Sequence, residues 1–171
     1  MSIFDRFTSK PRPPKGYKEV EMDFTVEEAE AINRGLKMYA EIANADAPEG
    51  MTAIVSKKFK DAITAKVLNE YVEDLMQRLR HCSEEETLVV MHKAIQAQMK
   101  VYAIHNLPVY LFQVAGMFEY LGDTAKAKEF FQLFLRTQSD FKPDKIDAYF
   151  LNQTGFDIAK TVSTARQKLI S

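Results

Sequence analysis

Residues 106–142 read NLPVYLFQVAGMFEYLGDTAKAKEFFQLFLRTQSDFK, and this stretch decides the fold that we predict for the chain. Two segments with apolar residues at helical spacing flank the Gly122-Asp123 pair. Asn106 is a good helix cap, and Pro108 is tolerated in a first helical turn because no backbone donor is needed there. Gly122 can end one helix in a left-handed conformation, and Asp123 can cap the next. The stretch therefore predicts two antiparallel helices joined by a tight turn.

Similar local signals predict helices on both sides of this hairpin. Thr25 with Glu28, and Ser83 with Glu86, have the capping-box spacing that begins a helix. No segment alternates with period two for long enough to indicate a strand. The expected helices cover residues 26–44, a start between 52 and 56 as far as 80, and then 84–104, 107–121, 124–137 and 144–169. The last is expected to break at residues 152–155, Asn-Gln-Thr-Gly, which makes six helices or seven.

Residues 107–140 resemble a tetratricopeptide (TPR) repeat, a motif of two helices with small and large apolar residues at set offsets. The matching positions are Leu111, Val114, Ala115 and Phe118 in the first helix, Gly122-Asp123 in the turn, and Ala127 and Phe131 in the second helix. Phe134 stands where the repeat has a small residue, and Pro143 comes later than its closing proline. The fold class we predict is all-α, with antiparallel hairpins stacked as a TPR-like array or as an irregular helical bundle.

The chain divides by composition into an arm and one domain. Residues 1–24 contain Pro11, Pro13, Pro14 and Gly16, which prevent a continuous helix and favour extended backbone. We expect residues 1–24 to form an extended, partly mobile arm and residues 25–171 to form a single all-helical domain. A domain of this size needs neither a metal nor a disulfide for stability.

Charge and composition exclude several classes of function. The net charge of −1 argues against a dedicated nucleic-acid binder. No apolar run approaches the roughly 20 residues of a transmembrane helix, and the first residues lack the apolar region of a signal peptide. We therefore expect a cytoplasmic protein without a transmembrane segment.

The sequence offers no catalytic or metal-binding motif. His81, Cys82, His92 and His105 do not have the spacing of a known metal site, and Cys82 is expected to be inert. The glycines are isolated, so no phosphate-binding loop is predicted. We expect a non-enzymatic protein that uses neither a metal nor a cofactor.

The segment from Leu107 to Leu121 is apolar on nearly every side, which is typical of a central helix or of one that a partner covers. In the repeats that it resembles, the first helix lines a concave groove. The resemblance places the groove positions at Val109, Phe112, Gly116 and Glu119, and it implies a protein or peptide partner. Two alternatives remain open at this point: a bundle that encloses an apolar small ligand near Tyr102, Met117 and Phe134, and a structural homodimer.

Overall fold

The computed structural model describes residues 23–46 and 56–171, and every regular element in these residues is helical. The helices are α1 (Val26–Asp46), α2 (Ser56–Arg78), α3 (Glu84–Ile104), α4 (Val109–Tyr120), α5 (Thr124–Asp140), α6 (Lys145–Thr154) and α7 (Ile158–Ile170), with a 3-10 turn at Leu79–His81. The predicted all-α fold is confirmed, and so is the break in the last helix. The predicted N-terminal arm lies mostly outside the described residues.

The helix ends follow local chemistry at most of the predicted positions. Ser83 and Glu86 form a complete capping box at the start of α3. Asp123 caps α5 by accepting a hydrogen bond from the backbone N–H of Lys126. Gly155 ends α6 with a positive φ of 67°, a conformation that glycine adopts without steric cost. Capping residues therefore set these boundaries.

Asn106 is an exception, because it does not cap α4. That helix begins at Val109, and Pro108 occupies the cap position. The Asn106 side chain instead donates to the backbone carbonyl of Tyr102, 2.9 Å away in the last turn of α3. The Asn106 side chain therefore bonds to the end of α3 and not to the start of α4, and the predicted cap at Asn106 is wrong.

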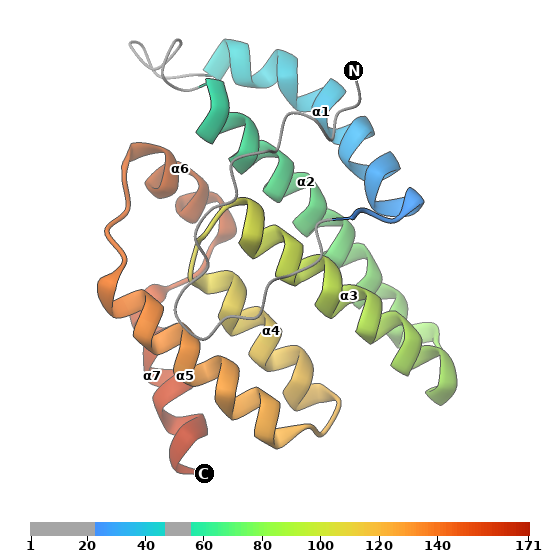
Figure 1. The fold of residues 1–171 in the computed structure, drawn as a ribbon, viewed down its shortest axis with the longest axis vertical. Coiled ribbons are helices and arrows are strands. Elements are labelled where there is room, and N and C mark those ends of the chain that lie inside the picture. Colours follow the sequence, from blue (N-terminus) through green and yellow to red (C-terminus); the bar gives the residue numbers. More distant parts are fainter. Residues whose placement is uncertain (1–22, 47–55) are drawn as a thin grey trace.

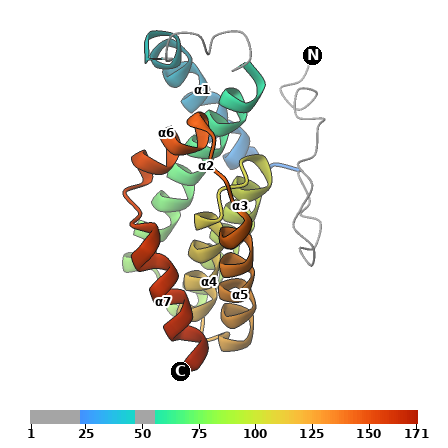
Figure 2. The same cartoon turned by 90° about the vertical axis from the view of Figure 1, so that its left-hand side faces the viewer.

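Successive helices pack as antiparallel hairpins, and α4 is central (Figure 1). The α2–α3 and α4–α5 pairs form the most extensive contacts, and α3 also packs on α4. In the side view of Figure 2, α7 lies beside α4 and α5, and its more extensive contacts are with α5. The core that these helices share includes the fully buried side chains of Leu68, Met91, Tyr102, Leu111 and Phe134.

The last two helices do not continue a regular stack. α7 packs against α5, whereas α6 packs back against the beginning of α2 (Figures 1 and 2). A regular array would place α6 against α5, its predecessor in sequence. A groove lies between α2 and α4, and α6 closes one end of it.

Candidate functional site

Two polar stripes face each other across this groove. On α2, Lys66, Asn69, Glu73 and Gln77 recur at three- and four-residue spacing and so share one side of the helix. The opposite side of α2 carries the buried residues Leu68 and Leu75. On α4, Tyr110, Gln113 and Gly116 have the same kind of spacing. Each helix therefore turns one stripe to the core and another to the groove.

The groove consists of two adjoining hollows. The upper hollow, beside α6, has a volume of about 320 Å³, and the lower hollow has a volume of about 520 Å³. Glu73 and Gln113 line both hollows, so the two are continuous. Five of the lining side chains are carboxamides: Asn69, Gln77, Gln98, Gln113 and Gln153. A carboxamide both donates and accepts hydrogen bonds, as a peptide backbone does.

Gln98 lies at the floor of the lower hollow and is fully buried. Its Nε2 donates to Asn69 Oδ1 at 3.1 Å and to Gln113 Oε1 at 2.9 Å. Its own Oε1 is buried and accepts no hydrogen bond from the described residues. An unpaired buried carbonyl oxygen costs about 1–3 kcal/mol. The acceptor lies beneath the groove surface, and the amide N–H groups of Gln98 hold the lining residues Asn69 and Gln113 in place.

Gly116 keeps the lower hollow open. A Cβ atom added at this position would meet no heavy atom within 4 Å. Glycine in a helix interior costs roughly 0.5–1 kcal/mol relative to alanine. No neighbouring atom in the described structure requires a glycine at position 116. The effect of Gly116 is to leave space in the lower hollow.

The upper hollow combines charged and aromatic side chains. Lys66 Nζ pairs with Glu70 Oε1 at 3.2 Å, and Glu73 Oε1 accepts a hydrogen bond from Asn69 Nδ2 at 2.9 Å. Burial, and after it the negative charge of Glu73, hold the pKa of Tyr110 well above its usual range. The phenol of Tyr110 is therefore neutral beside a carboxylate at physiological pH.

A buried ionic network fastens α6 at the end of the groove. Asp147 accepts from Lys58 Nζ at 2.9 Å, and its other oxygen lies 2.9 Å from His105 Nε2. Lys58 also pairs with Asp144, the cap residue of α6. The side chains of His105 and Asp147 are only 4% and 7% exposed. Three separate parts of the chain, α2, the end of α3 and α6, are thereby joined.

Hydrogen bonds in this network control the ionisation of Asp147. Burial by itself would raise the pKa of Asp147, but hydrogen bonds from His105 and Lys58 outweigh it and hold that pKa well below its usual range. The neighbouring ring of Phe150 contacts His105 edge-on, with ring centroids 5.8 Å apart. Phe150 also lines the upper hollow. The network therefore positions a wall of the groove.

The structure distributes the four predicted partner-binding residues between the core and the surface. Val109 is fully buried, and Phe112 lies against Phe131 and Phe134 of α5, each with ring centroids 5.5 Å away. Gly116 and Glu119 are exposed, but Glu119 pairs with Lys168 of α7 at 2.6 Å. Gly116 alone among the four lines the groove.

The open stripe of α4 is offset from the predicted one. Gln113 and Gly116 face the groove, whereas the predicted stripe follows Val109 and Phe112. Successive residues of an α-helix point about 100° apart, so the step from Phe112 to Gln113 turns the stripe by about that angle. The rotation arises because α5 covers Phe112.

Sequence reasoning missed Asn69, Glu73, Gln98, Gln113 and Gln153. The signal that could have found some of them is a carboxamide at an otherwise apolar position. Gln98 stands between the buried Ala97 and Val101, and Gln113 precedes the buried Val114. Their convergence depends on how α2, α3 and α4 pack, which no local pattern contains.

The residues proposed to surround an apolar ligand are instead packed together. Tyr102 and Phe134 are at most 2% exposed, and Met117 is 5% exposed. Burial raises the pKa of Tyr102 to about 12. Met117 lines the lower hollow of the groove together with Val72 and Met76. No specific contact of these three residues favours an apolar ligand over close packing.

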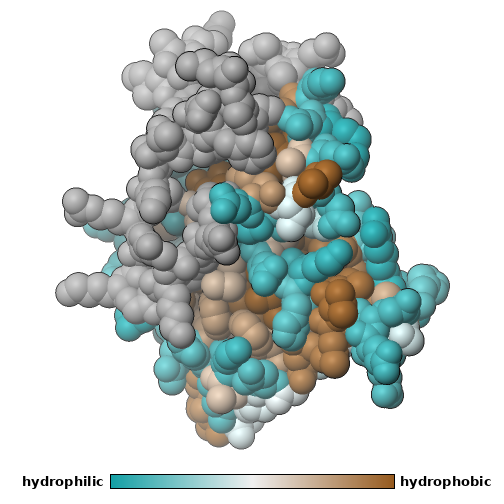
Figure 3. All heavy atoms as spheres, turned by 45° about the vertical axis from the view of Figure 1, so that its right-hand side comes forward, coloured by the Kyte–Doolittle hydropathy of each residue, from teal (hydrophilic) through white to brown (hydrophobic). Residues whose placement is uncertain are grey.

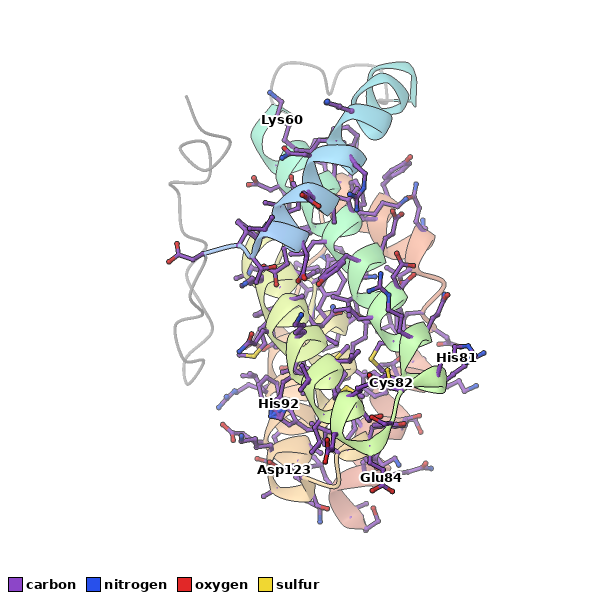
Figure 4. The ribbon with its side chains drawn as sticks, turned by 90° about the vertical axis from the view of Figure 1, so that its right-hand side faces the viewer. Lys60, His81, Cys82, Glu84, His92 and Asp123 are labelled. Atoms are coloured by element: carbon purple, nitrogen blue, oxygen red, sulfur yellow. The ribbon has the colours of Figure 1, made fainter. Side chains whose placement is uncertain are left out.

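The histidines and the cysteine lie apart in the structure. Figure 4 shows His81 projecting outward at the end of the 3-10 turn, away from His92 on α3. Cys82 Sγ donates to the carbonyl of Arg78 at 3.3 Å. No group of three or more His, Cys, Asp or Glu side chains in residues 23–46 and 56–171 is arranged to hold a metal ion. In the same residues, no helix has both the length and the apolar character needed to cross a bilayer.

A second crevice, of about 460 Å³, lies between α1, α2 and α3. Its charged side chains pair with one another: Lys93 lies 3.5 Å from Glu27, and Arg34 lies 4.0 Å from Glu30. Val89 is 59% exposed beside it. In Figure 3, hydrophilic and hydrophobic side chains lie side by side on the face shown. This crevice shows no buried polar atom without a partner among the described side chains that line it.

Comparison with known proteins finds no relative of this chain. No protein-family model, curated protein or solved structure matches the chain.

Proposed function

We propose that this protein binds an extended segment of another protein in the groove between α2 and α4, and that it acts without catalysis. The single observation that carries the proposal is the row of carboxamides, Asn69, Gln77, Gln113 and Gln153, along the two adjoining hollows. The amide oxygens of these side chains suit the backbone N–H groups of a bound peptide. The same carboxamides supply donors for its backbone carbonyl groups.

The dimensions of the groove fit a short extended peptide. Lys66 and Gln77 mark its ends on α2, and eleven helical steps of about 1.5 Å give a length of roughly 16 Å. An extended chain advances about 3.3 Å per residue, so roughly five residues span this length. The TPR resemblance is consistent with such a mode, because the first helices of successive hairpins line the binding groove in that family.

The experiment is a selection from phage-displayed random peptides of roughly eight residues, followed by fluorescence anisotropy with the selected peptides. Each peptide is tested on wild type, on Gly116→Trp and on Gly116→Ala. We expect Gly116→Trp to weaken binding at least tenfold, because the indole fills the lower hollow. Gly116→Ala is the matched control: it adds a Cβ into open space and is expected to leave the affinity within about twofold.

A second control separates the groove from the α1–α3 crevice. Val89→Ser changes an exposed residue of the crevice and leaves the groove intact. The proposal is overturned if no peptide is selected, or if the selected peptides bind Gly116→Trp as tightly as wild type. Loss of binding in Val89→Ser instead would assign the interaction to the crevice. Light scattering of the free protein distinguishes a homodimer, the remaining alternative occupant of the groove.

A further inference from the structure

The upper hollow of the groove has an unbalanced charge. It contains the carboxylates of Glu70 and Glu73 but one cation, Lys66. Lys66 pairs with Glu70 at 3.2 Å. Glu73 forms no ion pair with any cation among the described side chains, and it accepts a hydrogen bond from the neutral amide of Asn69. One carboxylate of the hollow therefore remains available for a positive charge.

The walls of the same hollow suit a cation with a flat surface. Tyr110, Phe150 and Phe156 all line it, and of these three rings Phe156 is the partly exposed one. The faces of aromatic rings attract a cation within about 6 Å, and arginine is the commoner partner in such contacts. Beside them, the carboxamide of Gln153 can accept further hydrogen bonds from a guanidinium. A volume of about 320 Å³ lies at the lower end of the range for small-ligand pockets, so it suits one long side chain.

The buried amide network connects this hollow to the peptide-binding floor. Gln98 is fully buried, and it donates to Asn69 and Gln113, which both line the upper hollow. Asn69 in turn donates to Glu73. The carboxylate is therefore held by a neutral hydrogen-bond chain that begins at the buried amide of Gln98. This arrangement leaves the charge of Glu73 uncompensated while it keeps the side chain in place.

We propose that the upper hollow is a specificity pocket for an arginine side chain of the bound segment, with Glu73 pairing with the guanidinium. Arginine presents a rigid planar fork that can bond a carboxylate through two parallel N–H groups, whereas lysine is a compact point charge. This inference rests on the proposed peptide-binding function, because the arginine must be carried by a segment that occupies the groove.

The test uses the peptides selected on wild type and versions in which each arginine is replaced by citrulline, which keeps the shape and removes the charge. We expect every peptide that requires an open Gly116 to contain arginine. Citrulline should weaken its binding to wild type at least tenfold, or about 1.4 kcal/mol. On Glu73→Gln the same replacement should change affinity by less than twofold. Glu129→Gln, at an exposed position on α5, is the matched charge control and should behave as wild type.

The outcomes separate the two proposals. Peptides that need an open Gly116 but bind equally well with citrulline would overturn the arginine pocket and leave peptide binding in place. Replacement of arginine by lysine without loss would also overturn it, because a point charge would then suffice. Absence of any groove-dependent peptide would overturn both proposals. Circular dichroism and urea unfolding of Glu73→Gln establish that the variant is folded before binding is compared.

Discussion

Alanine substitutions at two helical glycines are expected to change stability in opposite directions. In an isolated helix both changes are favourable, because alanine has a helix propensity about 0.8–1 kcal/mol better than glycine. At Gly116 the new Cβ meets no heavy atom within 4 Å. Gly116→Ala should therefore raise the free energy of unfolding by about 0.5–1 kcal/mol.

At Gly35 the same atom has no space. Its Cβ would lie 2.1 Å from Val67 Cγ1 and 2.5 Å from Val67 Cβ. Ordinary carbon contacts are about 3.5–4.0 Å, and Val67 is buried, so α1 must move away from α2. Overpacking of this kind costs typically 1–3 kcal/mol, which exceeds the gain in propensity. We expect Gly35→Ala to lower the free energy of unfolding by about 1 kcal/mol, or roughly 2–4 °C in Tm.

Urea unfolding followed by far-ultraviolet circular dichroism measures both changes. The structural cause is tested by Val67→Ala, which removes the two methyl groups that oppose Gly35. We expect Val67→Ala to cost at least about 1 kcal/mol less in the Gly35→Ala background than in wild type. If Gly35→Ala proves as stabilising as Gly116→Ala, the close approach of α1 and α2 is refuted.

Three further perturbations test the buried polar groups by urea unfolding. Lys100→Met leaves Glu28 buried without its ion-pair partner at 2.7 Å and should lower the free energy of unfolding by about 3–5 kcal/mol. Adding Glu28→Gln should recover most of this loss. A loss below about 1 kcal/mol in Lys100→Met alone would contradict the expectation. Asp147→Asn should cost about 3 kcal/mol near neutral pH. Folding lowers the pKa of Asp147, so the ionised carboxylate stabilises the fold fully at pH values above its unfolded pKa near 3.8. That stabilisation is lost as the pH falls below this value. A cost of Asp147→Asn that does not depend on pH would therefore disprove the role of the ionised carboxylate. Gln98→Leu removes the unpaired oxygen but also the two hydrogen bonds that Nε2 donates to Asn69 and Gln113. These effects oppose each other, so the free energy of unfolding should change by less than about 1 kcal/mol; a loss above about 3 kcal/mol would contradict this.

The helices and their ends were largely predictable because their determinants are local. A capping box at Ser83 and Glu86 acts within one turn, and so does the left-handed Gly155. The failure at Asn106 is also local in its cause, since the side chain bonds backward to Tyr102 rather than forward into α4. Two partners competed within hydrogen-bond reach, and the residue type alone could not choose between them.

The groove was predictable only in part. The TPR resemblance predicted a binding face on α4, and Gly116 does line the groove, although the resemblance itself stays a prediction. Phe112 faces α5 instead of the groove, because a large aromatic side chain gains more from burial than from exposure. Helical periodicity identifies an apolar stripe, but it does not say which neighbour covers that stripe when several are apolar.

By itself, then, the sequence determined the all-helical fold, most of the turn positions and the antiparallel hairpins, because caps, glycines and apolar spacing act over a few residues. Only the tertiary structure decided that α6 returns to α2. Asp147 meets His105 across 42 residues and Lys58 across 89, and such contacts depend on the whole packing arrangement. The same arrangement brings the carboxamides of α2, α3 and α4 together around Gln98. The stretch 106–142 therefore predicts a central hairpin, while the polar groove beside it exists only because distant helices bury their apolar faces together.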